Sequence, residues 1–371
     1  MEFKIEKEDF VKGLSRIQSV VEKKVTMPIL SNALIETKGT GILITATDLE
    51  IGIQGYYPAN IQKEGKATLS AKKLFEVVKE LPEKEVSFRL KENQWVEVFS
   101  GKSIFKIMGL AAETFPSLPA YEEEGFYEAD SAVLKEMIEK TIFAVSTDES
   151  RYNLRGVFFS RVDAENGSGV RMVATDGYRI AIIERPLKIE MKGLENGILL
   201  PKKGLAELNK ILSESGENVF VKLKNNNFIV KKEKMVLIMR LLDAEFPDYK
   251  QVVPAKTKRH IQMKRGQILE SLHRVSILSS EKTKGVKFHF GQDYLELSSY
   301  NPELREAKEE LAIDFKGEDL IVGFNSRFIL EVLDSFQSEE IILEIEDEKS
   351  PALLRPLNDR QHSCVIMPMR I

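Results

Sequence analysis

The 371-residue sequence predicts an α+β protein made of three copies of one domain. The same order of helices and strands occurs three times, and its period is near a third of the chain. Matching residues of the first two copies, such as Leu74 and Leu205 or Phe115 and Phe246, lie 131 positions apart. Solenoid repeats have periods of about 20 to 50 residues, so each copy is expected to be a domain with its own core.

An amphipathic helix is predicted at the start of each copy. Its apolar residues recur at intervals of three and four, which places them on one helical face. These residues are Phe10, Leu14, Ile17 and Val21 in the first copy, Leu134, Ile138, Ile142 and Val145 in the second, and Ile268, Leu272 and Val275 in the third, where the polar Ser279 occupies the next position of the same face.

Two alternating strands around a short polar turn are predicted next. A second helix follows in each copy, over residues 74–81, 205–212 and 329–336, and then hairpin strands such as those flanking Asn225-Asn226-Asn227. The turns between the alternating strands contain Thr47-Asp48, Thr175-Asp176 and Tyr300-Asn301-Pro302.

Domain boundaries are predicted where charge runs, Gly and Pro interrupt the periodic pattern, at Glu122-Glu123-Glu124-Gly125 and Pro254-Ala255-Lys256. The predicted domains are therefore 1–123, 124–254 and 255–371. The alternative is a single large α+β enzyme whose elements happen to alternate. The repeated Thr-Asp turn and the repeated Phe-Pro phrase argue against it.

The composition, 43% apolar and 30% charged, is that of a folded globular protein. The net charge of −4 speaks against a protein that coats nucleic acid through overall positive charge, so a nucleic-acid role requires Lys and Arg to gather on one surface. The single cysteine, Cys364, cannot form an internal disulfide or a zinc site of clustered thiolates.

A cytoplasmic location is expected from two features of the sequence. The longest apolar run, 235–239, is far shorter than the about 18 residues of a membrane-spanning helix. The N-terminal residues lack the apolar stretch of a signal peptide.

Catalytic motifs are incomplete. Gly101-Lys102-Ser103 resembles the end of a phosphate-binding loop, but Val96 stands where that loop needs glycine. The four histidines lack the pair spacing of a metalloprotease. Asp48 and Asp176 could act as acids, bases or metal ligands, although Asp in such turns more often bonds its own backbone. We therefore expect no resident cofactor or metal and a function that lies in surfaces.

The phrases of this chain closely resemble those of the bacterial DNA polymerase III beta subunits, the replicative sliding clamps. The resemblance covers the entire chain in order and at family spacing. The phrases are MPILSN at 27–32, TDLE at 47–50, RYNLRG at 151–156, VATDGYR at 173–179, FPDY at 246–249, GFN at 323–325 and VIMPMRI at 365–371.

The resemblance implies three clamp domains per chain and a head-to-tail homodimer closed into a ring around duplex DNA. Helices would line the hole and antiparallel sheets would form the outside. The seam would join the first domain to the third, with Phe105 and Ile107 packing against Ile277 and Leu278. Such a protein is a non-catalytic processivity factor, found in the cytoplasm on the nucleoid.

The resemblance also implies that basic residues on the inner helices face the DNA. Enclosure needs only weak, sequence-independent attraction to phosphates, so a negative net charge is compatible with it. The positions that match the family are Lys24 and Tyr152. The candidates on the inner helices are Lys72, Lys73, Lys202 and Lys203, and further ones are Lys12, Lys135, Lys140, Lys210, Lys264 and Arg274.

A cleft between the second and third domains is also implied, and it receives a short extended peptide rich in Gln, Leu and Phe. The family's partners there are the polymerase III alpha subunit, other polymerases, the clamp loader and repair proteins. Methionines and aliphatic groups suit such varied ligands because they repack easily. The matching positions are Leu154, Thr175, Gly177, Tyr178, Arg179, Ile180, Pro247, Val252, Asn325, Phe328, Val365, Ile366, Met367, Pro368, Met369 and Arg370.

Two other functions remain open on the sequence. One is a specialised clamp paralogue that encircles DNA, which gene context would distinguish. The other is a metal-dependent enzyme that uses Asp48 or Asp176, which substitution of both by Asn would inactivate.

Overall fold

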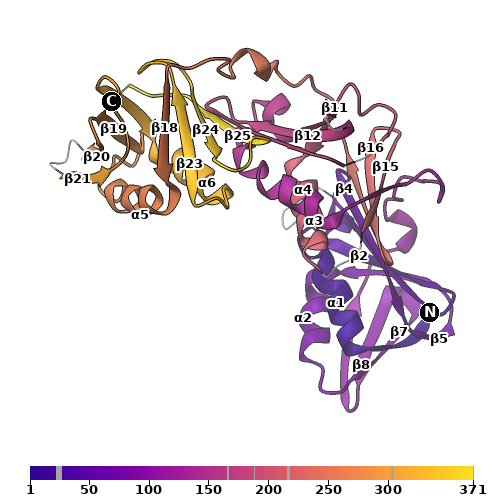
Figure 1. Ribbon diagram of the computed structural model, residues 1–371. Coiled ribbons are helices and arrows are strands. Elements are labelled where there is room, and N and C mark those ends of the chain that lie inside the picture. The colour runs from indigo at the N-terminus through magenta and orange to yellow at the C-terminus, as the bar shows by residue number, and fades with distance from the viewer. Residues whose placement is uncertain (22–26, 165–166, 188, 215–217, 302–304, 371) are drawn as a thin grey trace. The chain divides into compact units, whose positions relative to one another are not determined.

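Among the residues that the structure describes, six α-helices recur along the chain, two per repeat, and each follows a strand with at most one residue between them (Figure 1). The computed structural model describes residues 1–21, 27–164, 167–187, 189–214, 218–301 and 305–370. This confirms the predicted α+β class and the two helices of each copy. The helices are α1 (Lys7–Ile17), α2 (Ala71–Glu80), α3 (Ser131–Glu139), α4 (Lys202–Leu212), α5 (Arg265–Ser276) and α6 (Ser326–Ser335).

The first helix of each repeat ends earlier than predicted. Val21 and Ser279 lie beyond the ends of α1 and α5, and Ile142 belongs to a separate 3-10 turn, Ile142–Ala144. Apolar spacing alone therefore overestimated helix length.

Polar side chains near these three ends explain the difference. Gln18 donates to the carbonyl of Leu14 at 2.9 Å, Thr141 to that of Met137 at 2.8 Å, and Ser276 to that of His273 at 2.9 Å. Each side chain satisfies one of the carbonyls that lack a partner in the last turn of a helix, so the backbone can leave the helical path.

The strands within Met1–Ser131 and Lys203–Leu241, the first of two compact units, form two antiparallel sheets. One has the order β5 (Asn60–Lys63), β1 (Glu2–Glu6), β7 (Glu85–Leu90), β8 (Trp95–Ser100) and β9 (Ser103–Met108). The other has the order β10 (Tyr127–Ala129), β15 (Val219–Lys224), β16 (Asn227–Lys232), β17 (Met235–Arg240), β4 (Ile51–Pro58), β3 (Gly41–Thr47), β2 (Asn32–Lys38) and β6 (Lys66–Ser70).

The second unit, Ala132–Lys202 with Leu242–Ile371, also contains two antiparallel sheets. The larger has the order β14 (Ile198–Pro201), β11 (Gly156–Ala164), β12 (Gly167–Thr175), β13 (Arg179–Arg185), β25 (His362–Ile366), β24 (Ala352–Pro356), β23 (Glu340–Ile345) and β18 (Arg259–Lys264). The smaller has the order β21 (Arg305–Ala312), β20 (Tyr294–Asn301), β19 (Gly285–Gly291) and β22 (Leu320–Asn325).

The second repeat contributes strands to both units. Its β17 pairs with β4 of the first repeat, with Leu237 opposite Ile53. Its β13 pairs with β25 of the third repeat, with Ala181 opposite Cys364. Each eight-stranded sheet therefore combines strands of two repeats.

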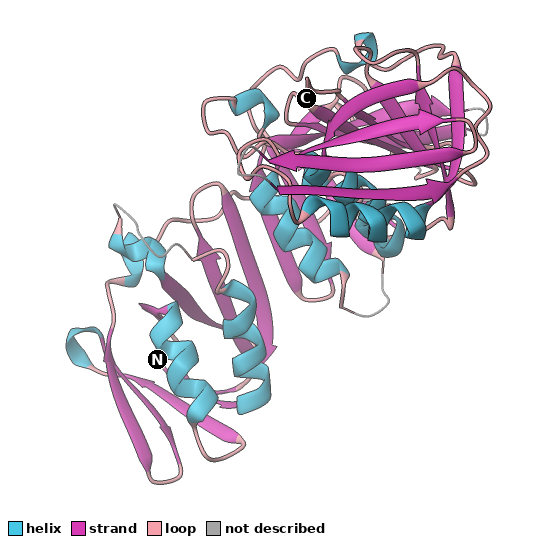
Figure 2. Cartoon of the chain, turned by 90° about the vertical axis from the view of Figure 1, so that its left-hand side faces the viewer, coloured by secondary structure: helices cyan, strands magenta, loops and turns pink. Residues whose placement is uncertain are grey.

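Helices α1 and α2 lie side by side against strands of the first unit (Figures 1 and 2). The predicted apolar face of α1 is buried at Phe10, Leu14 and Ile17, and α2 buries Leu74 and Val78. Amphipathic spacing thus identified the core-facing side of these helices. None of the helices among the described residues is long and apolar enough to span a membrane.

The predicted Asn hairpin is confirmed between β15 and β16. Asn225 and Asn226 have φ angles of 49° and 59°, and Lys224 pairs with Asn227. Two successive positive φ angles give the turn that matches the twist of antiparallel strands, and Asn tolerates them well. The third-repeat turn cannot be compared, because Pro302 lies outside the described residues.

Candidate functional site

Asp48 fixes the backbone of its own turn. Its Oδ1 accepts from the amides of Glu50 and Ile51 at 2.9 and 2.6 Å. The Thr47 hydroxyl donates to the carbonyl of Ile51 at 2.9 Å and accepts from the amide of Leu49 at 3.0 Å.

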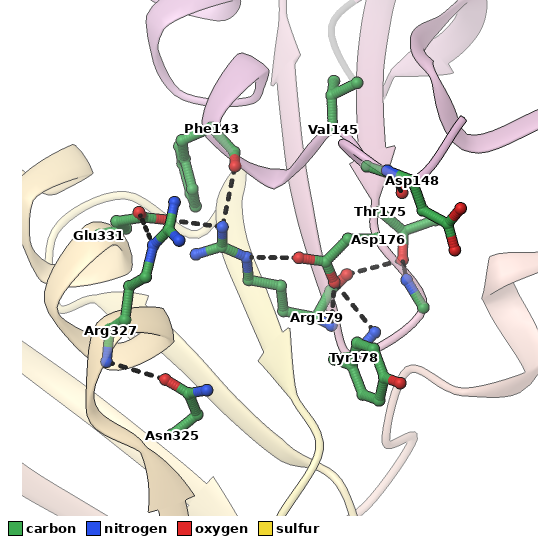
Figure 3. Close-up of polar contacts among 12 residues, drawn as sticks. Phe143, Val145, Asp148, Thr175, Asp176, Tyr178, Arg179, Asn325, Arg327 and Glu331 are labelled. Atoms are coloured by element: carbon green, nitrogen blue, oxygen red, sulfur yellow. Dashed lines mark hydrogen bonds and ion pairs between the residues drawn. The ribbon is translucent and has the colours of Figure 1, made fainter. Parts of the chain in front are cut away.

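Asp176 holds the corresponding turn of the second repeat through the same atoms. Its Oδ1 accepts from the amides of Tyr178 and Arg179 at 3.0 and 3.1 Å. Thr175 donates to the carbonyl of Arg179 at 2.6 Å and accepts from the amide of Gly177 at 3.0 Å (Figure 3). Both aspartates therefore have the turn-fixing role that the sequence offered as the alternative to catalysis.

The second carboxylate oxygen distinguishes the two turns. In the first unit Asp48 forms an ion pair with Lys203, whereas Asp176 binds the guanidinium of Arg179 from its own turn at 3.1 Å. No group of three or more ligating side chains within the described residues could hold a metal ion.

Arg179 is a buried cation, with 4% of its surface exposed. Its guanidinium donates to the carbonyl of Phe143 at 2.9 Å and pairs with Asp176 and Glu331 at 3.1 and 2.5 Å (Figure 3). It also lies over the rings of Phe143 and Phe328, 5.1 and 4.5 Å from their centroids. Desolvated cation–π contacts of this kind are strong.

Glu331, on α6, joins this group to a second arginine. Its carboxylate binds Arg179 at 2.5 Å and Arg327 at 2.8 Å. Burial would raise the pKa of Glu331, but the hydrogen bond from Arg327 and the charge of Arg179 outweigh burial and lower it. The pKa of the neighbouring Lys202 is lowered by burial and then by the charge of Arg179.

The Asp176 turn meets the C-terminal tail through backbone pairing. Arg179 and Ile180 lie opposite Ile366 and Val365 in the β13–β25 pair, and the amide of Met367 donates to the carbonyl of Tyr178 at 2.9 Å. We call residues 175–180, Phe328 and 365–369 the turn–tail site. Most of the predicted peptide-cleft residues lie in it.

Further along the tail, the amide of Met369 donates to the carbonyl of Gly323, on β22, at 2.8 Å. The tail is therefore held at both ends of the segment 367–369.

The predicted cleft residues divide into an accessible set and a supporting set. Tyr178, Val252 and Met367 are 55, 42 and 40% exposed. The ring of Tyr178 stacks with that of Phe328 at 6.3 Å. Of the others, Gly177, Pro247 and Arg370 are exposed, Asn325, Phe328, Pro368 and Met369 are half-buried, and Leu154, Thr175, Arg179, Ile180, Val365 and Ile366 are buried.

Three residues near the turn–tail site were not predicted. Arg151 lies over the ring of Tyr178 at 5.7 Å, and Phe143 and Glu331 hold Arg179. The four-residue spacing of Arg327 and Glu331 on a helix could have indicated their ion pair. No local signal marks Phe143, whose carbonyl is brought to Arg179 by tertiary packing.

Comparison with known proteins gives a match over nearly the whole chain. Residues 1–119, 128–248 and 250–370 match the N-terminal, central and C-terminal domains of the DNA polymerase III beta subunit. The beta sliding clamp of Vibrio cholerae is 31% identical, with 100% of both chains covered. The chain belongs to the DNA polymerase III beta-subunit family, the sliding clamps.

Solved sliding clamps share the fold. The clamp of Bartonella birtlesii bound to griselimycin has a TM-score of 0.95 at 31% identity, and that of Thermotoga maritima has a TM-score of 0.90 at 31% identity. Both matches cover 100% of this chain, and they cover 100% and 99% of the solved chains. The resemblance in the sequence phrases is thereby confirmed.

The DNA-facing positions expected of a sliding clamp have varied surroundings. Lys72 and Lys73, in the first turn of α2, have exposed side chains 3.9 and 3.0 Å from Glu76. Tyr152 is 45% exposed. The ammonium of Lys202 lies 3.4 Å from the carbonyl of Val145, Lys203 is paired with Asp48, and Lys24 lies outside the described residues.

One inner-helix candidate of the clamp is corrected. Lys140 is only 7% exposed, and its ammonium binds Glu136 at 2.6 Å. A lysine held in this way supports the protein interior and does not present its charge to DNA.

The predicted seam residues of the clamp are accessible in the single chain. Phe105 lies on the edge strand β9 and is 39% exposed, and Ile107 is half-buried on the same strand. Ile277, directly after α5, is 77% exposed, and Leu278 is half-buried.

Proposed function

We propose that this chain is a replicative sliding clamp that encircles duplex DNA as a homodimeric ring and holds DNA polymerase III on its template. The observation that carries the proposal is the match of three consecutive segments to the three beta-subunit domains. The proposed domains are 1–123, 124–254 and 255–371. In this function the chain transfers no nucleotides itself, and its place is on the nucleoid.

Retention by enclosure fits the charge of the chain. A clamp must stay on DNA while binding it only weakly. Each contact between a phosphate and Lys or Arg makes binding tighter and more salt-dependent, and so resists movement along the DNA. A net charge of −4 with exposed lysines such as Lys72 and Lys73 on α2 supports weak attraction inside a closed ring.

Ring closure is proposed at Phe105 and Ile107 of one subunit and Ile277 and Leu278 of the other. Edge strands with exposed apolar side chains are ready to pair with another chain. The exposed Ile104, Phe105 and Met108 on β9 support this use of the edge.

Partner binding is proposed at the turn–tail site, completed by the remaining predicted cleft residues. Its accessible Tyr178 and Met367 and its buried aliphatic floor suit an extended peptide with apolar side chains. The proposed partners are the polymerase III alpha subunit, other polymerases, the clamp loader and repair proteins.

The decisive experiment measures retention on DNA. Labelled protein is loaded onto nicked circular plasmid by a bacterial clamp loader with ATP, isolated in moderately high salt, and examined before and after the plasmid is linearised. Loss only after linearisation supports enclosure. Retention after linearisation contradicts it, since a directly bound protein does not depend on a closed circle.

Deleting residues 367–371 tests the partner surface separately. We expect the truncated chain to lose polymerase and loader binding and to remain a dimer, because the deletion removes Met367 and Met369 but leaves β9 and α5 intact. Binding that persisted would mean that the partner surface lies elsewhere.

A further inference from the structure

We propose that Glu331 is a positioning residue for partner binding, acting through Arg179 on the wall formed by Tyr178 and Phe328. The inference rests on the proposed function of the turn–tail site. Glu331 is not among the residues that the family resemblance places in the cleft.

The contacts form a continuous stack. Arg179 lies between the rings of Phe143 and Phe328, at 5.1 and 4.5 Å, and Phe328 in turn stacks on Tyr178 at 6.3 Å. Tyr178 is the accessible end of this stack, and the buried guanidinium is behind it. The position of the cation thus determines where the aromatic wall lies.

The charges around Arg179 make Glu331 important. Three cations, Arg179, Arg327 and Lys202, interact here with two carboxylates, Asp176 and Glu331. Asp176 is also engaged with two backbone amides of its turn. Without the charge of Glu331, a single carboxylate would remain for three cations, and the buried guanidinium would be under-compensated.

The contact between Arg179 and Glu331 is an ion pair. Nη1 of Arg179 and Oε2 of Glu331, which lies 2.5 Å from Nη2 of Arg179, have no hydrogen-bond partner within the described part of the chain, so attraction between the two charges holds the guanidinium on this side. Glu331 accounts for the contact from α6, the helix that also carries Phe328 one turn earlier. Without this ion pair the guanidinium keeps its contacts with Asp176 and Phe143 but loses the one from α6, so the Phe328 ring beside it is held less firmly.

The test compares Glu331→Gln with Arg327→Gln in the full-length protein. Both variants remove the same Arg327–Glu331 ion pair within α6, but only Glu331→Gln removes the charge that faces Arg179. A third variant, Asp334→Asn, removes an exposed carboxylate from the same helix.

Affinity is measured by fluorescence anisotropy with a labelled five-residue peptide, Gln-Leu-Ala-Leu-Phe, and folding by thermal unfolding. We expect Glu331→Gln to bind about tenfold more weakly than the parent, within the range of mutations in a coupled network. Arg327→Gln and Asp334→Asn should bind within about twofold of the parent, because neither alters the contacts of Arg179.

The outcomes separate this inference from the proposed function. Equal affinity of the parent and Glu331→Gln overturns the positioning role, as does an equal loss in Arg327→Gln, which would assign the effect to α6. A Glu331→Gln protein that melts early and regains affinity on cooling below its transition also overturns it. If the parent itself does not bind the peptide, the proposed partner site is wrong.

Discussion

The residue after the aspartate distinguishes the two Thr-Asp turns. Leu49 has a φ of 77° and Gly177 a φ of 90°. A side chain with a Cβ pays about 1–2 kcal/mol for this left-handed conformation, which glycine adopts freely. The first turn is therefore strained, and the second, at the turn–tail site, is relaxed.

Exchange of these residues should have opposite effects. We expect Leu49→Gly to raise the free energy of unfolding by up to about 1 kcal/mol, because relief of strain exceeds the entropy cost of glycine. Gly177→Ala should lower it by about 1–2 kcal/mol. Its Cβ would lie 2.7 Å from Nη1 of Arg151. Urea unfolding of both variants measures the two changes, and changes of the same sign would contradict the argument.

His362 is fully buried, and neither ring nitrogen has a hydrogen-bond partner in the described structure. Burial lowers its pKa to about 3, and the charges that face it are Lys140, Arg185, Asp359 and Glu136. The unfolded chain binds a proton near pH 6.5, and the folded chain does so only near pH 3. Stability is therefore fully present above pH 6.5 and is lost as the pH falls toward 3.

Replacing His362 by Leu should remove this dependence. Between pH 7 and 5 the parent should lose stability with a slope approaching about 1.4 kcal/mol per pH unit from this group, and His362→Leu should not. The hydrogen bond from Arg185 lowers the pKa of Glu136 to about 2, so the stability that Glu136 contributes is lost mainly below its ordinary pKa of 4.5. The pH range from 7 to 5 therefore reports chiefly on His362. Urea midpoints at pH 7, 6 and 5 give the comparison. Parallel slopes in both proteins would show that other groups cause the acid sensitivity.

The residue types in the sequence predicted the two Thr-Asp turns, but they did not predict which charged side chains are buried. Thr and Asp in sequence contain the atoms that bond their own backbone, so the roles of Asp48 and Asp176 follow locally. Arginine is rarely fully buried, and the burial of Arg179 depends on Phe143 and Glu331, which are distant in the sequence. Such a cluster becomes visible only when the repeats are packed together.

At the scale of elements, the periodic spacing of apolar residues predicted each helix and its buried face. The ends of the helices depended instead on hydrogen bonds from side chains. The apolar spacing could not show that Gln18, Thr141 and Ser276 would take carbonyls of the last turns. The spacing of apolar residues also could not predict that β17 pairs with β4 and β13 with β25, because an alternating pattern predicts a strand but does not specify the neighbouring strand.

The edge strand β9 gives the element-scale prediction. We expect Phe105→Arg to weaken dimerisation by about 30-fold or more, as loss of an apolar anchor at an interface does. Light scattering after size exclusion over a concentration series measures the change. Phe220→Arg is the control, because Phe220 is 45% exposed on β15, which lies between β10 and β16 and is not an edge. A dimer that survives Phe105→Arg but not Phe220→Arg would move the seam away from β9.

For the whole molecule, repetition and charge have to be considered together. The helices of the first two copies carry exposed lysines such as Lys12, Lys72 and Lys210, while the net charge of the chain is −4. Enclosure and electrostatic attraction then make separable contributions to holding DNA. The first depends on a closed ring, and the second depends on salt.

A double variant, Lys72→Gln with Lys73→Gln, separates these contributions. On a short linear duplex, which a ring can leave, binding should weaken, and the slope of log affinity against log salt should fall by up to about 2, one for each phosphate that is no longer neutralised. On closed circular plasmid the loaded variant should be retained as long as the parent, because the substitutions do not touch β9 or α5. Anisotropy titrations at low and at moderate salt and gel filtration of loaded plasmid measure the two quantities.

The control is Lys258→Gln, a lysine whose side chain is 75% exposed outside the six helices. Faster loss from circles in the Lys72/Lys73 variant alone would mean that these lysines hold the clamp on DNA directly, and that enclosure is not sufficient.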